Sequence, residues 1–66
     1  MPIINASILE GRTVEQKRAL IRELAEGAVR ALGVREEQVR VIINEVSPEN
    51  WGTGAISKAD LEKKKP

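Results

Sequence analysis

Pro2, which directly follows Met1, is the residue with the clearest capacity for chemistry. If Met1 is removed, Pro2 carries a free secondary amine. The chain contains no His and no Cys, so this amine is the one nitrogen that could act as a general base near neutral pH. Nearby cations or an apolar pocket would favour its neutral form and lower its pKa. A second-position proline also occurs simply as a small residue after the first Met, so Pro2 alone does not establish an enzyme.

Two arginines are candidates for binding an anion. Arg12 lies in the turn expected after the first strand, at the end of the sheet where open α/β folds often bind ligands. Arg40 interrupts an otherwise apolar strand, and a guanidinium is costly to bury without a partner. The plainer interpretation pairs Arg40 with Glu37, Glu45 or a neighbouring subunit.

Trp51 is the sole aromatic residue and stands between Asn50 and Gly52 in a segment rich in turn formers. Such a tryptophan most often covers a small core. As the wall of a substrate pocket, its indole ring would instead lower the local polarity and help to keep an amine unprotonated. Both interpretations stay open at this point.

The size and composition of the chain predict self-association. A chain of 66 residues buries only about 60% of the surface that its unfolded form exposes. Disulfides are excluded and a zinc site is not expected, because the sequence has no Cys and no His. Hydrophobic residues nevertheless make up 41% of the chain. We therefore expect an obligate oligomer, in which a second subunit covers one face of a sheet.

Charge and hydropathy exclude several classes of partner. A net charge of +1 gives no reason to expect nucleic acid, and the chain lacks the aromatic residues on which RNA-binding sheets stack bases. The sequence has no signal-peptide pattern and no apolar run near the roughly 20 residues that cross a bilayer. We expect a soluble, cytoplasmic protein with no membrane partner.

The spacing of apolar residues predicts one helix between two strands. Residues 2–9 alternate in the manner of a strand, and residues 39–46 form a second, β-branched strand with apolar side chains on both faces. Residues 14–32 have helical periodicity. Thr13 resembles the start of a capping box, and Gly33 stands where a left-handed residue commonly ends a helix. Strand, helix and strand make a βαβ unit, which places the chain in the α/β (α+β) class with parallel strands.

The remaining residues predict short elements within the same domain. Residues 47–54 are dense in turn formers and predict a hairpin or tight loop. A short helical turn is expected at residues 57–64, and residues 63–66 are expected to be a solvated end. Since there is no linker and no internal repeat, residues 1–66 are expected to form a single domain.

Taken together, these features resemble the 4-oxalocrotonate tautomerase family, whose short βαβ subunits carry a catalytic N-terminal proline. The resemblance extends over nearly the whole chain. It rests on Met1-Pro2 before a strand, ILEGRT at residues 8–13, EQKRALIREL at residues 15–24, VRVIINEV at residues 39–46 and WGTGA at residues 51–55.

The resemblance implies a role for each candidate residue. Pro2 matches the proline that moves the proton, and Arg12 matches an arginine that binds a substrate carboxylate. Arg40 matches a second arginine, which reaches the site of an adjacent subunit and engages the 2-oxo/hydroxy and carboxylate end of the substrate. Trp51 stands where the family commonly has Phe, as an apolar wall, and Leu9 is expected beside the substrate.

The resemblance also implies an assembly and a reaction. Two βαβ units pair into a four-stranded sheet with two helices on one face, and three such dimers commonly form a hexamer. The implied reaction is enol–keto tautomerisation of a dienol dicarboxylate such as 2-hydroxymuconate, without a metal or an organic cofactor. Two arginines suit a substrate with a carboxylate at each end.

Other functions stay open. Superfamily relatives dehalogenate chloroacrylates or decarboxylate malonate semialdehyde, and others serve natural-product pathways. The hydrating dehalogenases carry an arginine and a water-activating carboxylate where this chain has Leu9 and Thr53, which favours a tautomerase, although Glu10 or Glu49 could supply a carboxylate. A non-catalytic oligomeric module that binds acidic ligands through the two arginines is the alternative from a different class.

Overall fold

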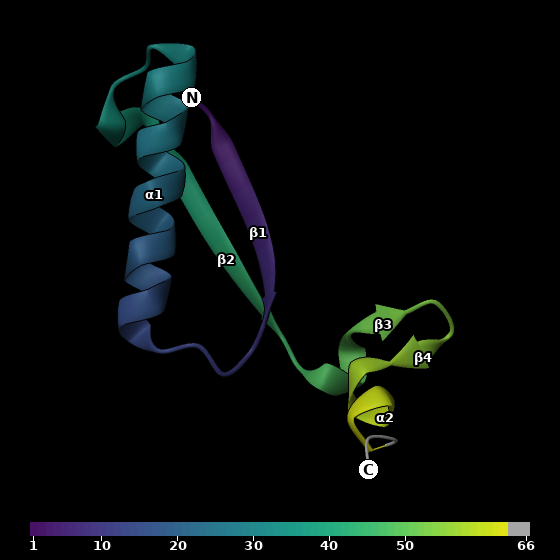
Figure 1. Ribbon diagram of the computed structural model, residues 1–66. Coiled ribbons are helices and arrows are strands. Elements are labelled where there is room, and N and C mark those ends of the chain that lie inside the picture. Colours follow the sequence, from purple (N-terminus) through teal and green to yellow (C-terminus); the bar gives the residue numbers. More distant parts are fainter. Residues whose placement is uncertain (64–66) are drawn as a thin grey trace.

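The computed structural model describes residues 1–63 and has a βαβ body followed by a short C-terminal extension (Figure 1). Two parallel strands, β1 and β2, lie against one long helix, α1. This arrangement confirms the predicted fold class. The elements of the body are β1 (Ile3–Leu9), α1 (Val14–Leu32), the 3-10 turn η1 (Glu36–Gln38) and β2 (Arg40–Val46).

The helix α1 has the predicted bounds because both of its ends are capped. The Thr13 hydroxyl accepts a hydrogen bond from the Gln16 N–H at 3.1 Å, and the Gln16 side-chain oxygen accepts one from the Thr13 N–H at 3.0 Å. This capping box satisfies two of the N–H groups that a helix start leaves free. Gly33 ends the helix in the left-handed conformation, with φ 70°.

Both strands begin one residue later than the sequence predicts. Strand β1 begins at Ile3, because Pro2 has no N–H to contribute to a ladder. Strand β2 begins at Arg40, because the N–H of Val39 is taken by the carbonyl of Glu36 at the end of η1. The register then runs from Ile3 opposite Arg40 to Leu9 opposite Val46.

The C-terminal extension is a hairpin flanked by two short helices. The 3-10 turn η2 (Pro48–Asn50) is followed by the antiparallel pair β3 (Gly52–Thr53) and β4 (Ile56–Ser57), and then by α2 (Lys58–Lys63). Helix α2 begins after Ser57, whose hydroxyl accepts a hydrogen bond from the Asp60 N–H at 3.2 Å. The prediction for residues 64–66 lies outside the described residues.

The two faces of the β1–β2 sheet differ in exposure. Ile4, Ala6 and Ile8 are half-buried, as expected for the face under α1. On the opposite face Ile3 and Ile42 are 61% and 47% exposed. Among residues 1–63, Val39 is the only hydrophobic residue that counts as buried. The single chain therefore leaves two isoleucines open to solvent on the sheet face away from α1.

The shape of the single chain is extended. Its radius of gyration is 15.4 Å, whereas a compact domain of this length has about 11 Å. The hairpin and α2 stand away from the βαβ body (Figure 1). None of the helices in the described part of the chain has both the length and the apolarity that a membrane span requires.

Candidate active site

The backbones of Pro2 and Arg40 lie side by side at the end of the sheet where both strands begin. The N–H of Arg40 donates a hydrogen bond to the carbonyl of Pro2 at 3.0 Å. Pro2 is half-buried, whereas Met1 is 78% exposed. With Met1 attached, the Pro2 nitrogen belongs to an amide and has no basic lone pair, so any proton transfer by Pro2 requires removal of Met1.

The guanidinium of Arg40 is held by backbone carbonyls rather than by a carboxylate. Its Nη1 donates to the carbonyl of Glu37 at 2.7 Å and more weakly to that of Val39 at 3.4 Å. Of the partners considered for Arg40, Glu37 offers its backbone carbonyl but not its carboxylate. Glu45 pairs with Lys17 at 3.0 Å, so neither ion pair predicted within the chain is found among the described residues. Within residues 1–63, no carboxylate lies within 4.0 Å of the Arg40 side chain.

Arg12 lines a cavity at the opposite end of the sheet. The cavity has a volume of about 240 Å³ and lies where β1 ends and α1 begins. Lys17 carries a second positive charge into the cavity wall, but the Glu45 carboxylate pairs with it. No acidic side chain in the described part of the chain pairs with Arg12. The lining residues are Ile8, Arg12, Gln16, Lys17 and Leu20.

Sequence reasoning missed Lys17 and Gln16 as neighbours of Arg12. A signal was present, because Lys17 stands three residues before Leu20 and seven before Leu24. This spacing puts its ammonium on the apolar face of the helix. A lone cation on such a face needs an acidic partner, which the structure supplies from β2 as Glu45.

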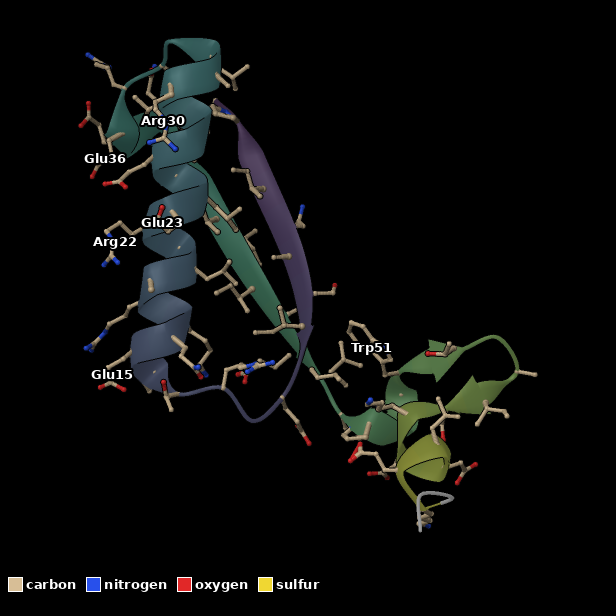
Figure 2. The ribbon with its side chains drawn as sticks, in the orientation of Figure 1. Glu15, Arg22, Glu23, Arg30, Glu36 and Trp51 are labelled. Carbon is tan, nitrogen blue, oxygen red and sulfur yellow. The ribbon has the colours of Figure 1, made fainter. Side chains whose placement is uncertain are left out.

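Trp51 and Leu9 also lie at the end of the sheet that carries Arg12. Leu9 is half-buried and pairs with Val46 in the register of the two strands. Trp51 is half-buried at the junction between β2 and the hairpin (Figure 2). The carbonyl of Trp51 accepts a hydrogen bond from the N–H of Lys58 at 2.7 Å, which fixes the start of the extension.

The candidate residues therefore form two half-sites in one chain. Pro2 and Arg40 lie at one end of β1, and Leu9, Arg12 and Trp51 lie at the other. A seven-residue strand spans about 20 Å. A single chain therefore does not bring all five candidate residues together. Among residues 1–63, no three acidic side chains converge to hold a metal ion.

The family model for tautomerase enzymes matches residues 2–61 of this chain. The chain belongs to the tautomerase family. Two curated relatives cover most of this chain and of their own length. A probable tautomerase of Ralstonia nicotianae is 48% identical over 59 residues, covering 89% of this chain and 84% of the relative. The 2-hydroxymuconate tautomerase of Comamonas testosteroni is 41% identical over 61 residues, covering 92% and 97%.

Solved structures of tautomerases have the same fold. A 4-oxalocrotonate tautomerase isozyme from Methylibium petroleiphilum is 44% identical, with a TM-score of 0.92 over 94% of this chain and 97% of that one. A heterohexameric 4-oxalocrotonate tautomerase from Chloroflexus aurantiacus is 44% identical, with a TM-score of 0.88 over 92% and 98%. These likenesses confirm the predicted family and the βαβ architecture, and they include an oligomeric relative.

Proposed function

We propose that this chain is an enol–keto tautomerase that uses the amine of Pro2, once Met1 is removed, on a 2-hydroxydienoate dicarboxylate such as 2-hydroxymuconate. The observation that carries the proposal is the surroundings of the two arginines, because Arg12 lines the cavity and backbone carbonyls hold the guanidinium of Arg40. Arg12 and Arg40 lack a carboxylate partner within residues 1–63, although acidic residues are abundant in the chain. Two unneutralised guanidinium groups suit a substrate with two carboxylates.

The reaction is a proton transfer between oxygen and carbon. The neutral amine of Pro2 takes the proton of the 2-hydroxyl group, the electrons move along the conjugated chain, and the carbonyl forms as a carbon at the far end of the chain receives a proton from the Pro2 ammonium. Arg40 binds the end that carries the 2-hydroxyl group and offsets the charge that develops on that oxygen. Arg12 binds the distal carboxylate.

The separation of the half-sites supports an active site shared between subunits. If two copies of β1 run in opposite directions, Pro2 of one copy lies near Arg12 of the other. The exposed sheet face with Ile3 and Ile42 supports further association. We propose a dimer with a four-stranded sheet and, as in the hexameric relative, six subunits. We also propose that residues 1–66 form one domain, of which the family match covers residues 2–61.

The other reactions of the superfamily remain alternatives for the substrate. Leu9 and Thr53 lack the groups that a hydrating dehalogenase needs at these positions. Trp51 in place of Phe reshapes the pocket, so a substrate from another pathway remains an alternative. Binding of an acidic ligand without catalysis is the alternative from a different class, and the same protein samples test both. A cytoplasmic location and activity without a cofactor stay predictions.

Turnover of a panel of enols, followed by ultraviolet absorbance, tests the proposal. The panel contains 2-hydroxymuconate, a monocarboxylate dienol and an arylpyruvate enol, and intact mass confirms that Met1 is absent. We expect ketonisation well above the buffer rate, fastest with 2-hydroxymuconate. The matched control is the untrimmed chain with Met1 attached, for which we expect no catalysis. Equal rates for trimmed chain and buffer with every enol would contradict the proposal.

A further inference from the structure

The turn before Arg40 carries three exposed charged side chains in succession. Arg35 precedes η1, and Glu36 and Glu37 are its first two residues. Figure 2 shows Glu36 on this turn, beside α1. The side-chain oxygen of Gln38 accepts a hydrogen bond from the Arg35 N–H at 3.0 Å, which fixes the start of the turn. The turn is thus an ordered support for the residue that follows it.

The turn determines which edge of the Arg40 guanidinium is free. A guanidinium has five N–H donors, of which two belong to Nη1. Nη1 faces the carbonyls of Glu37 and Val39, at 2.7 and 3.4 Å. No hydrogen-bond partner is found for Nε and Nη2 among the described residues. This pair of donors forms the planar edge that binds a carboxylate through two parallel hydrogen bonds.

Glu37, in the same turn, is a candidate competitor for that edge. Its backbone carbonyl already contacts Arg40 at 2.7 Å, so its carboxylate is within a side chain's length of the same guanidinium. The Glu37 carboxylate instead pairs with Nε of Arg35 at 3.4 Å. Both side chains of this pair are about three-quarters exposed, at 75% and 74%. Such a pair contributes little to the stability of the fold, but it favours conformations in which the Glu37 carboxylate lies beside Arg35 rather than beside Arg40.

We propose that Arg35 is a positioning residue, which keeps the Nε–Nη2 edge of Arg40 open for the substrate by holding the Glu37 carboxylate away from it. The inference rests on the proposed function in one respect, namely that Arg40 binds the substrate. It adds a residue that touches no substrate and governs affinity through an internal competitor. Without Arg35, the Glu37 carboxylate turns to Arg40 and occupies the edge.

Arg35→Ala tests the inference in trimmed, assembled protein. We expect the KM for 2-hydroxymuconate to rise about two- to fivefold, the effect of a weak exposed ion pair, with kcat nearly unchanged. The double variant Arg35→Ala/Glu37→Gln removes the competitor and should restore the wild-type KM. At about 1 M salt the Debye length falls to about 3 Å, so the rise in KM should shrink. An unchanged KM in Arg35→Ala would overturn the inference.

The matched control is Arg35→Ala/Glu36→Gln, which makes the same change of charge on the neighbouring residue. Glu36 has no ion-pair partner among the described residues, so the KM should stay raised. Equal restoration by Glu36→Gln and Glu37→Gln would overturn the inference, because Arg35 would then act only through net charge.

A binding measurement separates this inference from the proposed function. Calorimetric titration with muconate, a diacid that has no hydroxyl group to ketonise, needs no turnover. We expect the dissociation constants to follow the order of the KM values. Wild type and Arg35→Ala/Glu37→Gln should have similar constants, and Arg35→Ala and Arg35→Ala/Glu36→Gln should have larger ones. If wild type turns over no enol while this order holds, the proposed function fails and the role of Arg35 stands. Equal constants in all four proteins would overturn the role of Arg35.

Discussion

At the scale of single residues, the two arginines differ in what holds them. The guanidinium of Arg40 is anchored through Nη1 to backbone carbonyls, which fixes its orientation before any substrate arrives. Arg12 lies in an open cavity whose other cation, Lys17, is neutralised by Glu45. An anchored donor suits stabilisation of charge in a transition state, whereas a cation in an open cavity suits capture of a carboxylate.

The two arginines should therefore fail differently when truncated. Arg12→Ala is expected to raise KM about 10- to 100-fold, since hydrogen bonds to charged groups contribute about 1.5–3 kcal/mol. Arg40→Ala is expected chiefly to lower kcat, about 10²- to 10³-fold, with a smaller rise in KM because Arg40 also binds one end of the substrate. Steady-state kinetics with 2-hydroxymuconate distinguish the two effects. Arg22→Ala is the control, because Arg22 is exposed on the helix α1 (Figure 2). Unchanged kinetics in both variants would remove the arginines from the site.

The pH dependence of kcat/KM should report the Pro2 amine. Catalysis needs the neutral amine, so the rate should rise with pH as this amine loses its proton and then level off. In the proposed shared site, arginine side chains near the amine would disfavour its protonated form, so we expect a pKa below that of free proline. A pH–rate profile of the trimmed chain gives this pKa, and a value equal to that of free proline would argue against a cationic site.

The candidate residues could be proposed from residue types, whereas their ion-pair partners could not be predicted from the sequence. Pro2, Arg12 and Arg40 stand out because few other residues in this chain could do chemistry near neutral pH. The pairing of Arg40 with Glu45 was wrong, and strand geometry explains why. Residues five apart on a strand point to opposite faces, so these side chains could not meet. The role of Arg35 was invisible because it depends on the course of η1.

At the scale of elements, local signals predicted the helix better than the hairpin. The capping box and Gly33 define both ends of α1, and the bounds 14–32 follow from them. The strand starts differ by one residue because they depend on which N–H groups the turns use. The C-terminal hairpin has strands of only two residues, too short for an alternating pattern, so the sequence predicted a hairpin or tight loop at residues 47–54 without the bounds of its strands.

The capping box should make a measurable contribution to folding. Thr13→Ala removes the hydroxyl that accepts the Gln16 N–H, and the loss of such a cap costs about 1 kcal/mol. Thr13→Ser keeps the hydroxyl and is expected to be nearly neutral. Urea denaturation followed by circular dichroism, at one protein concentration, measures both. Equal destabilisation by the two substitutions would mean that the methyl group of Thr13, rather than its hydroxyl, matters.

At the scale of the whole molecule, the single chain does not make a core of its own. Its radius of gyration of 15.4 Å exceeds the value of about 11 Å for a compact domain of this length. Ile3 and Ile42 are exposed on the sheet face away from α1. The composition predicts association between subunits, because the chain is short, rich in apolar residues and free of Cys and His, and the exposed isoleucines are consistent with that prediction. The separation of the half-sites could not be predicted without the register of the strands.

Assembly should depend on the exposed sheet face. Ile42→Lys places a charge on that face, where the side chain is already 47% exposed in the single chain. The lysine should not destabilise a single chain, in which it stays in water. Between subunits its unpaired ammonium would be buried, which is costly and should weaken the assembly. We expect light scattering to give wild type a molar mass that is a multiple of the mass of one chain, six times that mass for a hexamer. The molar mass of Ile42→Lys should be smaller. Glu15→Lys on α1 is the control. A monomeric, fully folded wild type would contradict the assembly.

Complementation between two damaged chains tests most directly whether Pro2 of one copy works with Arg12 of another. Pro2→Ala and Arg12→Ala, each trimmed of Met1, are assayed alone, and then unfolded together and refolded in equal amounts, at a 2-hydroxymuconate concentration far below the KM of Arg12→Ala. A shared site predicts that mixing regenerates intact sites, about a quarter of them if copies combine at random. Activity of the mixture no higher than the average of the separate variants would contradict the shared site.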